Sequence, residues 1–148
     1  MGTITFHVMM ELFLTDSPTP DDIKVLSDGL FDFNVKALGS FDRTPLGVFV
    51  RDEVTNQIVG GLTGATSLGV LFVDWFYLPE SMRGSGLGGT LLQQAEEEAV
   101  RRGCRTGVLF TLSVQAPGFY VKQGWRQFGD IPSIPDGLSR RYFTKELG

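Results

Sequence analysis

Cysteine and histidine are scarce in this chain, which has one of each, Cys104 and His7. A single cysteine excludes an intrachain disulfide and suits a reducing compartment, so we expect a cytoplasmic protein. One His and one Cys cannot form a recognisable zinc site, and no bound metal is expected. Cys104 stands between Gly103 and a hydrophobic run, which favours a buried structural thiol over a reactive one.

Positive charge and long apolar runs are also lacking. The formal net charge is −4, so the basic footprint of a nucleic-acid-binding protein is missing and nucleic acid is not an expected partner. No run approaches the roughly 18 apolar residues of a membrane span, and Met1–Asp16 has no basic n-region. We therefore expect no membrane association. An anionic ligand would need a local device for its phosphates, because the overall charge repels it.

What is present is the composition of an ordinary globular domain. The chain has 148 residues, 42% of them hydrophobic and 20% charged, which is enough to bury one core and argues against intrinsic disorder. There is no internal repeat and no linker long enough to divide the sequence. We expect a single domain over residues 1–148.

Residue patterns predict a mixed sheet. Stretches rich in β-branched and aromatic residues mark the expected strands: Thr3–Met9, Gly47–Arg51, Ile58–Thr66, Gly69–Leu78, Thr106–Leu112, Trp125–Phe128 and Arg141–Lys145. Helical spacing of apolar residues marks the expected helices: Asp21–Leu38, Leu87–Arg102 and Ala116–Gln123. Thr19 or Asp21 would cap the first helix, and Gly29 leaves open whether it is one helix or two.

The order of these elements predicts an α/β (mixed α+β) fold with about seven strands and about four helices. The strands are antiparallel at first, and a parallel crossover surrounds Leu87–Arg102. Gly69–Leu78 is apolar on both faces, which indicates a central strand. On the wet face of the Leu87–Arg102 helix, Glu97 should pair with Arg101 and Glu98 with Arg102.

The most informative segment is the glycine-rich loop Arg83–Gly89, placed between a buried strand and the clearest helix. Glycines allow the backbone to approach a ligand closely. The helix that begins here adds unpaired N–H groups and the positive end of its dipole, which together favour a pyrophosphate. Arg83 would add a full positive charge.

Other nucleotide-binding loops fit less well. Gly84, Gly86 and Gly89 satisfy G-x-G-x-x-G, but a dinucleotide fingerprint should follow the first strand and be followed by an acidic residue about 20 positions on. Here the loop lies in the middle of the chain, and the strand Thr106–Leu112 contains no carboxylate. A P-loop is excluded because no Gly-Lys-Ser/Thr follows. A flexible turn before a helix stays open as the simplest interpretation.

Two segments resemble the GNAT superfamily of N-acetyltransferases. Leu78-Pro-Glu-Ser-Met-Arg-Gly-Ser-Gly-Leu-Gly is similar to the family's acetyl-CoA signature, whose core is Arg/Gln-x-x-Gly-x-Gly/Ala; Arg83, Gly86 and Gly88 fill its three positions. Downstream, Tyr120-Val-Lys-Gln-Gly-Trp125 resembles a second family block. One departure is visible, because Ser113 stands where many members have an Asn. The element order is also similar, so the resemblance covers Thr3 to Leu147.

The resemblance implies acetyl-CoA as co-substrate and attack of a neutral amine on its thioester. It implies that the loop binds the CoA phosphates, that the Leu78 N–H stabilises the oxyanion, and that Leu78 and Pro79 run beside the pantetheine arm. The implied cofactor-binding residues are Leu78, Pro79, Arg83, Gly84, Ser85, Gly86, Leu87, Gly88, Gly89 and Ser113.

Two residues are candidates for proton transfer. Tyr120 would protonate the leaving thiolate, or else it is a core aromatic residue with a wet hydroxyl. Asp74 is the candidate base, because it precedes Leu78 by four residues and should therefore share its side of the strand. Its aromatic neighbours Phe72, Trp75 and Phe76 predict a partly desolvated carboxylate. An ordinary structural Asp is an equally open interpretation.

The acceptor amine is not identified by the sequence. In the fold that the resemblance implies, Asp21–Leu38 and Asp130–Ser139 would form the acceptor site. A small-molecule amine is the leading expectation. A protein N-terminal or lysine acetyltransferase and a non-catalytic acyl-CoA sensor are the alternatives, and a homodimer is left open.

Overall fold

The computed structural model describes residues 9–148. They divide into two compact units: the first ends at Ser40, and the second begins at Phe41. The expected strand Thr3–Met9 and His7 lie outside the described residues, save for Met9, which belongs to no regular element. Among residues 9–148, no helix has both the length and the apolar character needed to cross a bilayer.

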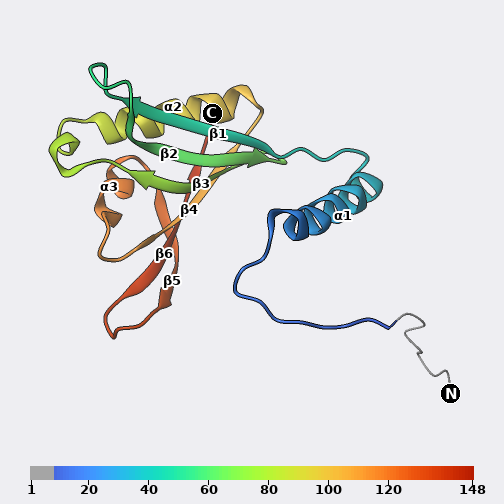
Figure 1. The fold of residues 1–148 in the computed structure, drawn as a ribbon. Helices are drawn as coiled ribbons and strands as arrows, with labels where there is room; N and C mark the ends of the chain where they lie inside the picture. Colours follow the sequence, from blue (N-terminus) through green and yellow to red (C-terminus); the bar gives the residue numbers. More distant parts are fainter. Residues whose placement is uncertain (1–8) are drawn as a thin grey trace. The chain divides into compact units, whose positions relative to one another are not determined.

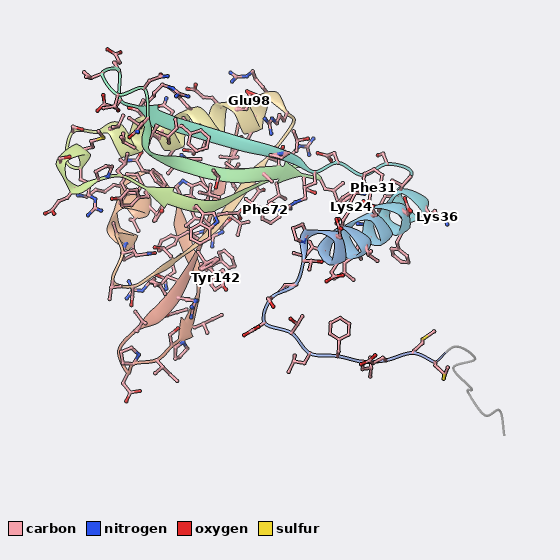
Figure 2. All side chains as sticks on the ribbon, viewed as in Figure 1. Lys24, Phe31, Lys36, Phe72, Glu98 and Tyr142 are labelled. Atoms are coloured by element: carbon pink, nitrogen blue, oxygen red, sulfur yellow. The ribbon has the colours of Figure 1, made fainter. Side chains whose placement is uncertain are left out.

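The first unit contains helix α1, Pro20–Leu38 (Figure 1). Thr19 caps it: the Thr19 hydroxyl accepts from the Asp22 N–H at 3.1 Å, and the Asp22 carboxylate accepts from the Thr19 N–H at 3.3 Å. This reciprocal capping box satisfies two donors that a helix start leaves unpaired. α1 is one continuous helix through Gly29, because a single glycine costs only about 1 kcal/mol in a helix. Lys24, labelled in Figure 2, forms an ion pair with Asp28 along it.

The second unit is a six-stranded sheet with the order β1-β2-β3-β4-β6-β5. Its strands are β1 (Thr44–Arg51), β2 (Ile58–Ser67), β3 (Val70–Tyr77), β4 (Thr106–Leu112), β5 (Arg126–Pro132) and β6 (Ser139–Glu146). Every neighbouring pair is antiparallel except β3 and β4, which are parallel. The predicted central position of β3 and the parallel crossover are therefore confirmed. Within residues 9–148 there are six strands, which match the six expected there, and three α-helices, one fewer than the approximate number expected.

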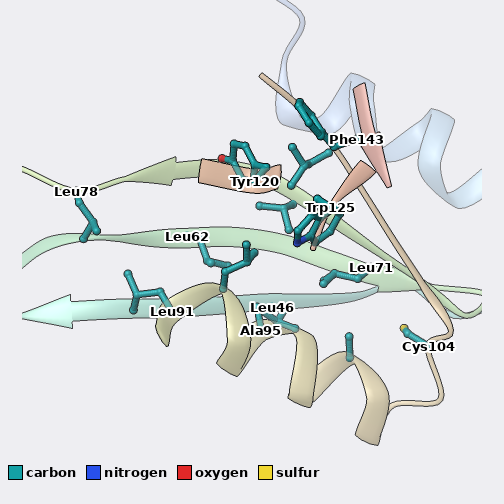
Figure 3. Packing of buried hydrophobic residues seen from close by; sticks show 14 residues of the cluster. Leu46, Leu62, Leu71, Leu78, Leu91, Ala95, Cys104, Tyr120, Trp125 and Phe143 are labelled. Carbon is teal, nitrogen blue, oxygen red and sulfur yellow. The ribbon is translucent and has the colours of Figure 1, made fainter. Parts of the chain in front are cut away.

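Helix α2 (Leu87–Arg101) supplies one side of the core (Figure 3). Its inward residues Leu91 and Ala95 face Leu62 and Leu46 of the sheet. Leu62 and Leu92 are at most 1% exposed, and full burial of such side chains contributes about 1.5–3 kcal/mol each. The packing of α2 thus holds β1–β3 together as the base on which the site is built.

The polar side of α2 differs in detail from its prediction. Glu98 pairs with Arg102 as expected, with a distance of 3.3 Å between Oε1 and Nε. Arg101 pairs with Glu98 rather than with Glu97, and Glu97 accepts from Gln93 instead. The hydrogen bond from Arg101 and the charges of both arginines lower the pKa of Glu98. Because i,i+3 and i,i+4 neighbours are equally close on a helix, side-chain packing chooses between them.

The parallel pairing of β3 and β4 stops early. It covers Val70–Val73 on β3 and Thr106–Leu109 on β4, although both strands continue for three or four residues. Figure 1 shows the two strands diverging beyond this point. The backbones at the carboxyl ends of β3 and β4 are thereby separated.

Candidate functional site

The glycine-rich loop leaves β3 through a short 3₁₀ turn, Glu80–Met82, and returns at α2. The Arg83 side chain closes this turn, since its Nε donates to the Leu78 carbonyl oxygen at 2.9 Å. Gly84 and Gly86 have φ angles of +80° and +85°, a region that disfavours any side chain, and a Cβ placed on either would meet no atom within 4 Å. The loop therefore presents bare backbone beside open space.

The first turn of α2 has neither a side-chain cap nor a negative charge. Gly86 is its N-cap and provides no side-chain acceptor, and the first turn contains no acidic residue. The N–H groups that a helix start leaves unpaired are consequently not neutralised by the protein, and they add to the positive end of the helix dipole. This contrasts with α1, whose first turn carries Asp21 and Asp22.

Two glycines of the segment have a packing reason of their own. A Cβ on Gly88 would lie 3.3 Å from the Phe119 ring and 3.6 Å from Leu78, and one on Gly89 would lie 3.1 Å from the Gln123 side chain. Phe119 and Gln123 come from helix α3 (Pro117–Lys122) and its C-cap. These glycines thus let α3 approach α2 closely, and their predicted contact with a cofactor stays a prediction.

Two further residues predicted to bind the cofactor have contacts within the protein. Leu87 packs against the core cluster, and the Ser85 hydroxyl donates to the Met82 carbonyl at 3.3 Å. Both positions belong to the loop and the first turn of α2, so their contact with a cofactor also stays a prediction.

Tyr120 on α3 lies in an aromatic cluster. Its ring centroid is 5.1 Å from that of Phe119, 5.7 Å from that of Phe143 and 6.5 Å from that of Phe76. Only 9% of the residue is exposed, and this burial raises the pKa of Tyr120 to about 12. In Figure 3 the hydroxyl end points toward Leu78 at the end of β3. Like any tyrosine, Tyr120 is protonated at neutral pH, and the raised pKa extends its protonated range to higher pH.

Leu78 connects this cluster with the loop. Its side chain is buried in the core, its carbonyl accepts from Arg83, and its Cδ1 lies close to Gly88. Pro79, the N-cap of the 3₁₀ turn, follows directly. The sequence-predicted residues Leu78, Arg83, Gly88 and Tyr120 are thus brought to one place, through the shared neighbour Phe119.

Asp74 is not where the sequence predicted it. Val73 pairs with Gly64 and Trp75 with Thr63, so Asp74 is an extra residue in the register of β3 against β2. The irregularity reverses the alternation along β3, and Asp74 is exposed while Leu78 is buried. The expectation that Asp74 shares the side of Leu78 and is enclosed by aromatic rings is therefore wrong. Its role as the base stays a prediction.

The irregularity in β3 has a visible cause on β2. A Cβ on Gly64 would lie 1.8 Å from the Phe72 carbonyl oxygen, so only glycine permits this approach of the two backbones. Such bulges bend a strand and increase its local twist. The bend coincides with the point at which β3 leaves β4.

Ser113 follows β4 and is tied to the beginning of β6. Its N–H donates to the Ser139 carbonyl at 2.8 Å, and its Oγ accepts from the Ser139 N–H at 3.0 Å. The hydroxyl proton of Ser113 still allows one donated bond to a ligand. Its contact with a cofactor stays a prediction.

The model of the "Acetyltransferase (GNAT) family" matches residues 6–125 of this sequence, which includes the loop and Tyr120. The chain belongs to the GNAT acetyltransferase family. The resemblance found in the two sequence motifs is confirmed, and so is the fold class that it implied.

Individual proteins are also similar to this chain. A protein from Agrobacterium tumefaciens, described as an acetyltransferase, is 32% identical and has a TM-score of 0.85, with 93% of this chain and 100% of that chain covered. The blasticidin-S acetyltransferase of Streptomyces morookaense is 37% identical over 62% of this chain and 68% of its own length. A protein from Bacillus anthracis solved in complex with acetyl coenzyme A shares the fold, with a TM-score of 0.61 at 19% identity over 71% of this chain and 64% of that chain.

Other chemistry-bearing groups lie away from this GNAT site. Within residues 9–148, no three His, Cys, Asp or Glu side chains are placed to hold a metal ion. Cys104 is 5% exposed, and burial, with the nearby charge of Asp42, raises the pKa of its thiol. The predicted structural thiol is thus found buried.

A groove of about 500 Å³ lies between α2 and the end of β6, and none of the predicted site residues lines it. It contains the ion pair of Glu96 with Lys145.

Sequence reasoning missed two parts of the site. Phe76, Phe119 and Phe143 enclose Tyr120, although they come from β3, α3 and β6. Arg141 on β6 has a buried Nε for which the described residues supply no hydrogen-bond partner. Phe119 adjoins Tyr120 in sequence and was the only signal of the cluster. No sequence signal pointed to Arg141, because its neighbours are set by the pairing of three strands.

Proposed function

We propose that this protein transfers an acetyl group from acetyl-CoA to the primary amine of a small molecule, by direct attack within a ternary complex. The observation that carries the proposal is the convergence of two features: the uncapped start of α2 and the buried, protonated Tyr120. The first suits the phosphates of CoA, and the second suits a leaving thiolate.

The residues present fit a CoA phosphate group. Gly84 and Gly86 leave open space beside their backbone, and α2 begins without an acidic residue that would repel an anion. Backbone N–H groups of residues 86–89 would hold the phosphates, as helix starts do in other anion sites. Arg83 would add charge from the guanidinium that its Nε anchors to Leu78. Acetyl-CoA supplies the activated acyl group, and the protein supplies position and proton transfer.

Tyr120 would act on the sulfur that departs. Because its phenol is protonated at neutral pH, it can donate a hydrogen bond to a developing thiolate. Its packing among three aromatic rings fixes the direction of that bond, which lowers the entropy lost on reaching the transition state. The Leu78 N–H is the proposed donor to the oxyanion, since Pro79 has none.

Asp74 is the proposed base. The carboxylate is exposed at the bend of β3, so it would receive the proton of the amine through water rather than from a closed pocket. Its matched test is Asp74→Asn, which keeps the shape and removes the basic oxygen. An unchanged dependence of kcat/KM on pH in that variant would assign the proton to solvent.

A small-molecule acceptor is supported by the blasticidin-S acetyltransferase, which matches this chain over more than half its length. The deciding experiment screens a panel of amines, amino acids and aminoglycosides for release of CoA thiol, with confirmation of the acetylated product by its intact mass. A peptide library with free N-termini and lysines is run beside it.

Thiol release with a small amine, lost in Gly86→Val and reduced in Tyr120→Phe, is the expected result. Turnover restricted to peptides would replace the small-molecule acceptor by a protein. Acetyl-CoA binding measured by calorimetry, without thiol release from any acceptor, would make the protein a non-catalytic acyl-CoA binder and would refute the proposal.

A further inference from the structure

Arg141 is the one arginine whose buried Nε is left without a partner within the part of the chain that the structure describes. It forms no ion pair with another described residue either. An unpaired guanidinium N–H inside a protein is unfavourable, so a native structure retains one where a ligand or water completes it. The surroundings of Arg141 bear on whether a ligand fits there.

The strand register places Arg141 beside the proposed site. Arg141 pairs with Thr111 of β4, two residues beyond the last contact between β3 and β4. Phe143 follows two residues later on the same side of β6, and its ring centroid lies 5.7 Å from that of Tyr120. On the other flank, Ser113 pairs with Ser139, two residues before Arg141. Arg141 thus lies on the Tyr120 side of the sheet, at the open end of the divergence.

The protein groups around Arg141 do not bond to its side chain. The Thr111 hydroxyl donates to Gln115 Oε1 at 2.8 Å. Asp130 stands directly opposite on β5 and is exposed, yet the two side chains form no ion pair. Arg140, the adjacent residue, belongs to the other side of β6 and donates to Ser133 Oγ at 3.1 Å. None of these described groups accepts a hydrogen bond from the Arg141 guanidinium.

We propose that Arg141 binds a carboxylate carried by the acceptor, so that amino acids and similar amino-carboxylates are the preferred acceptor class. A guanidinium matches a carboxylate with two parallel hydrogen bonds, and neutral amines offer it no such partner. The inference rests on the proposed function and specifies its substrate. Arg141 is a binding residue and takes no part in proton transfer.

The test compares amino acids with their methyl esters, which keep the amine and remove the negative charge. Thiol release is measured with acetyl-CoA for the wild type, Arg141→Met and the matched control Arg140→Met, which loses the same charge from the neighbouring position. The quantity compared is the ratio of kcat/KM for acid over ester. The ratio for each variant is divided by the ratio for the wild type, which cancels the different reactivity of the two amines.

We expect the acid-to-ester ratio to fall by about 10- to 100-fold in Arg141→Met, mainly through KM, and to be unchanged in Arg140→Met. Arg141→Lys keeps the charge without the fork and should lose part of the preference; it also serves if the methionine variant does not fold. The same ratio in wild type and Arg141 variants, or an equal fall in Arg140→Met, would overturn the inference while thiol release upholds the proposed function. No thiol release from any member would overturn both.

Discussion

Replacing Tyr120 by phenylalanine removes a single oxygen atom and keeps the ring that packs against Phe76, Phe119 and Phe143. The hydroxyl has no hydrogen-bond partner among the described residues, so its loss should leave the free energy of unfolding near neutral pH almost unchanged. Any large effect on turnover therefore reports on catalysis rather than on packing.

The size of that effect follows from the pKa of Tyr120, which is about 12. An ordinary thiol has a pKa of about 8.5, so complete transfer of the phenolic proton to a thiolate would be uphill by about 5 kcal/mol. Tyr120 should act chiefly as a hydrogen-bond donor to the developing charge, which contributes about 1.5–3 kcal/mol. We expect kcat to fall about 10- to 150-fold, with acetyl-CoA affinity nearly unchanged.

Alkaline unfolding gives an independent readout of the same residue. Folding raises the pKa of Tyr120 from 10.0 to about 12. The contribution of this shift to the free energy of unfolding is therefore complete below pH 10 and is lost as the pH rises toward 12. The loss is about 1.4 kcal/mol at pH 11. Tyr120→Phe should be spared this loss in the free energy of unfolding. The matched control is Tyr142→Phe, which changes a half-buried phenol on the other side of the sheet.

Steady-state kinetics and denaturant titrations between pH 7 and 11 measure both effects. A variant as fast as the wild type would leave solvent as the acid. A higher KM for acetyl-CoA with unchanged kcat would mean that Tyr120 only shapes the pocket. Either result would refute the catalytic assignment. If wild type and Tyr120→Phe lose the same free energy of unfolding between pH 10 and pH 11, the argument from burial is refuted.

Three further substitutions test the loop. Gly86→Val should abolish acetyl-CoA binding in calorimetric titration but retain the fold, because it blocks open space and strains a φ of +85°; wild-type affinity would contradict the loop assignment. Arg83→Ala should weaken acetyl-CoA binding less at high salt than at low salt, and a salt-independent loss would assign Arg83 only to its bond with Leu78. Gly88→Ala should lower the free energy of unfolding by about 1–3 kcal/mol, since its methyl group would lie 3.3 Å from Phe119; unchanged denaturant midpoints would show that α3 yields freely.

Most of the local structure could be predicted from the sequence, because its signals are local. The apolar spacing of Leu87–Arg102 marked α2 to within one residue, and Thr19 capped α1 as expected. The loop Arg83–Gly89 was recognisable as a phosphate-binding candidate because its glycines and the following helix are contiguous. The family resemblance is carried by two such contiguous segments, and it needs no knowledge of which strands pair.

Gly29 shows the limit of a local rule, since a glycine that could have divided α1 is accommodated within it. Capping at both ends and the helical residues around it outweigh its cost.

What tertiary structure alone decided is the set of neighbours across strands. Asp74 was expected beside Leu78 from simple alternation, but the close approach of Gly64 to β3 adds one residue to the register and turns the carboxylate to solvent. The aromatic enclosure that raises the pKa of Tyr120 joins three elements distant in sequence. The position of Arg141 is set by its pairing with Thr111 on β4 and with Asp130 on β5. Strand register and burial depend on how all the strands of the sheet pair, so they cannot be predicted from any single stretch of sequence.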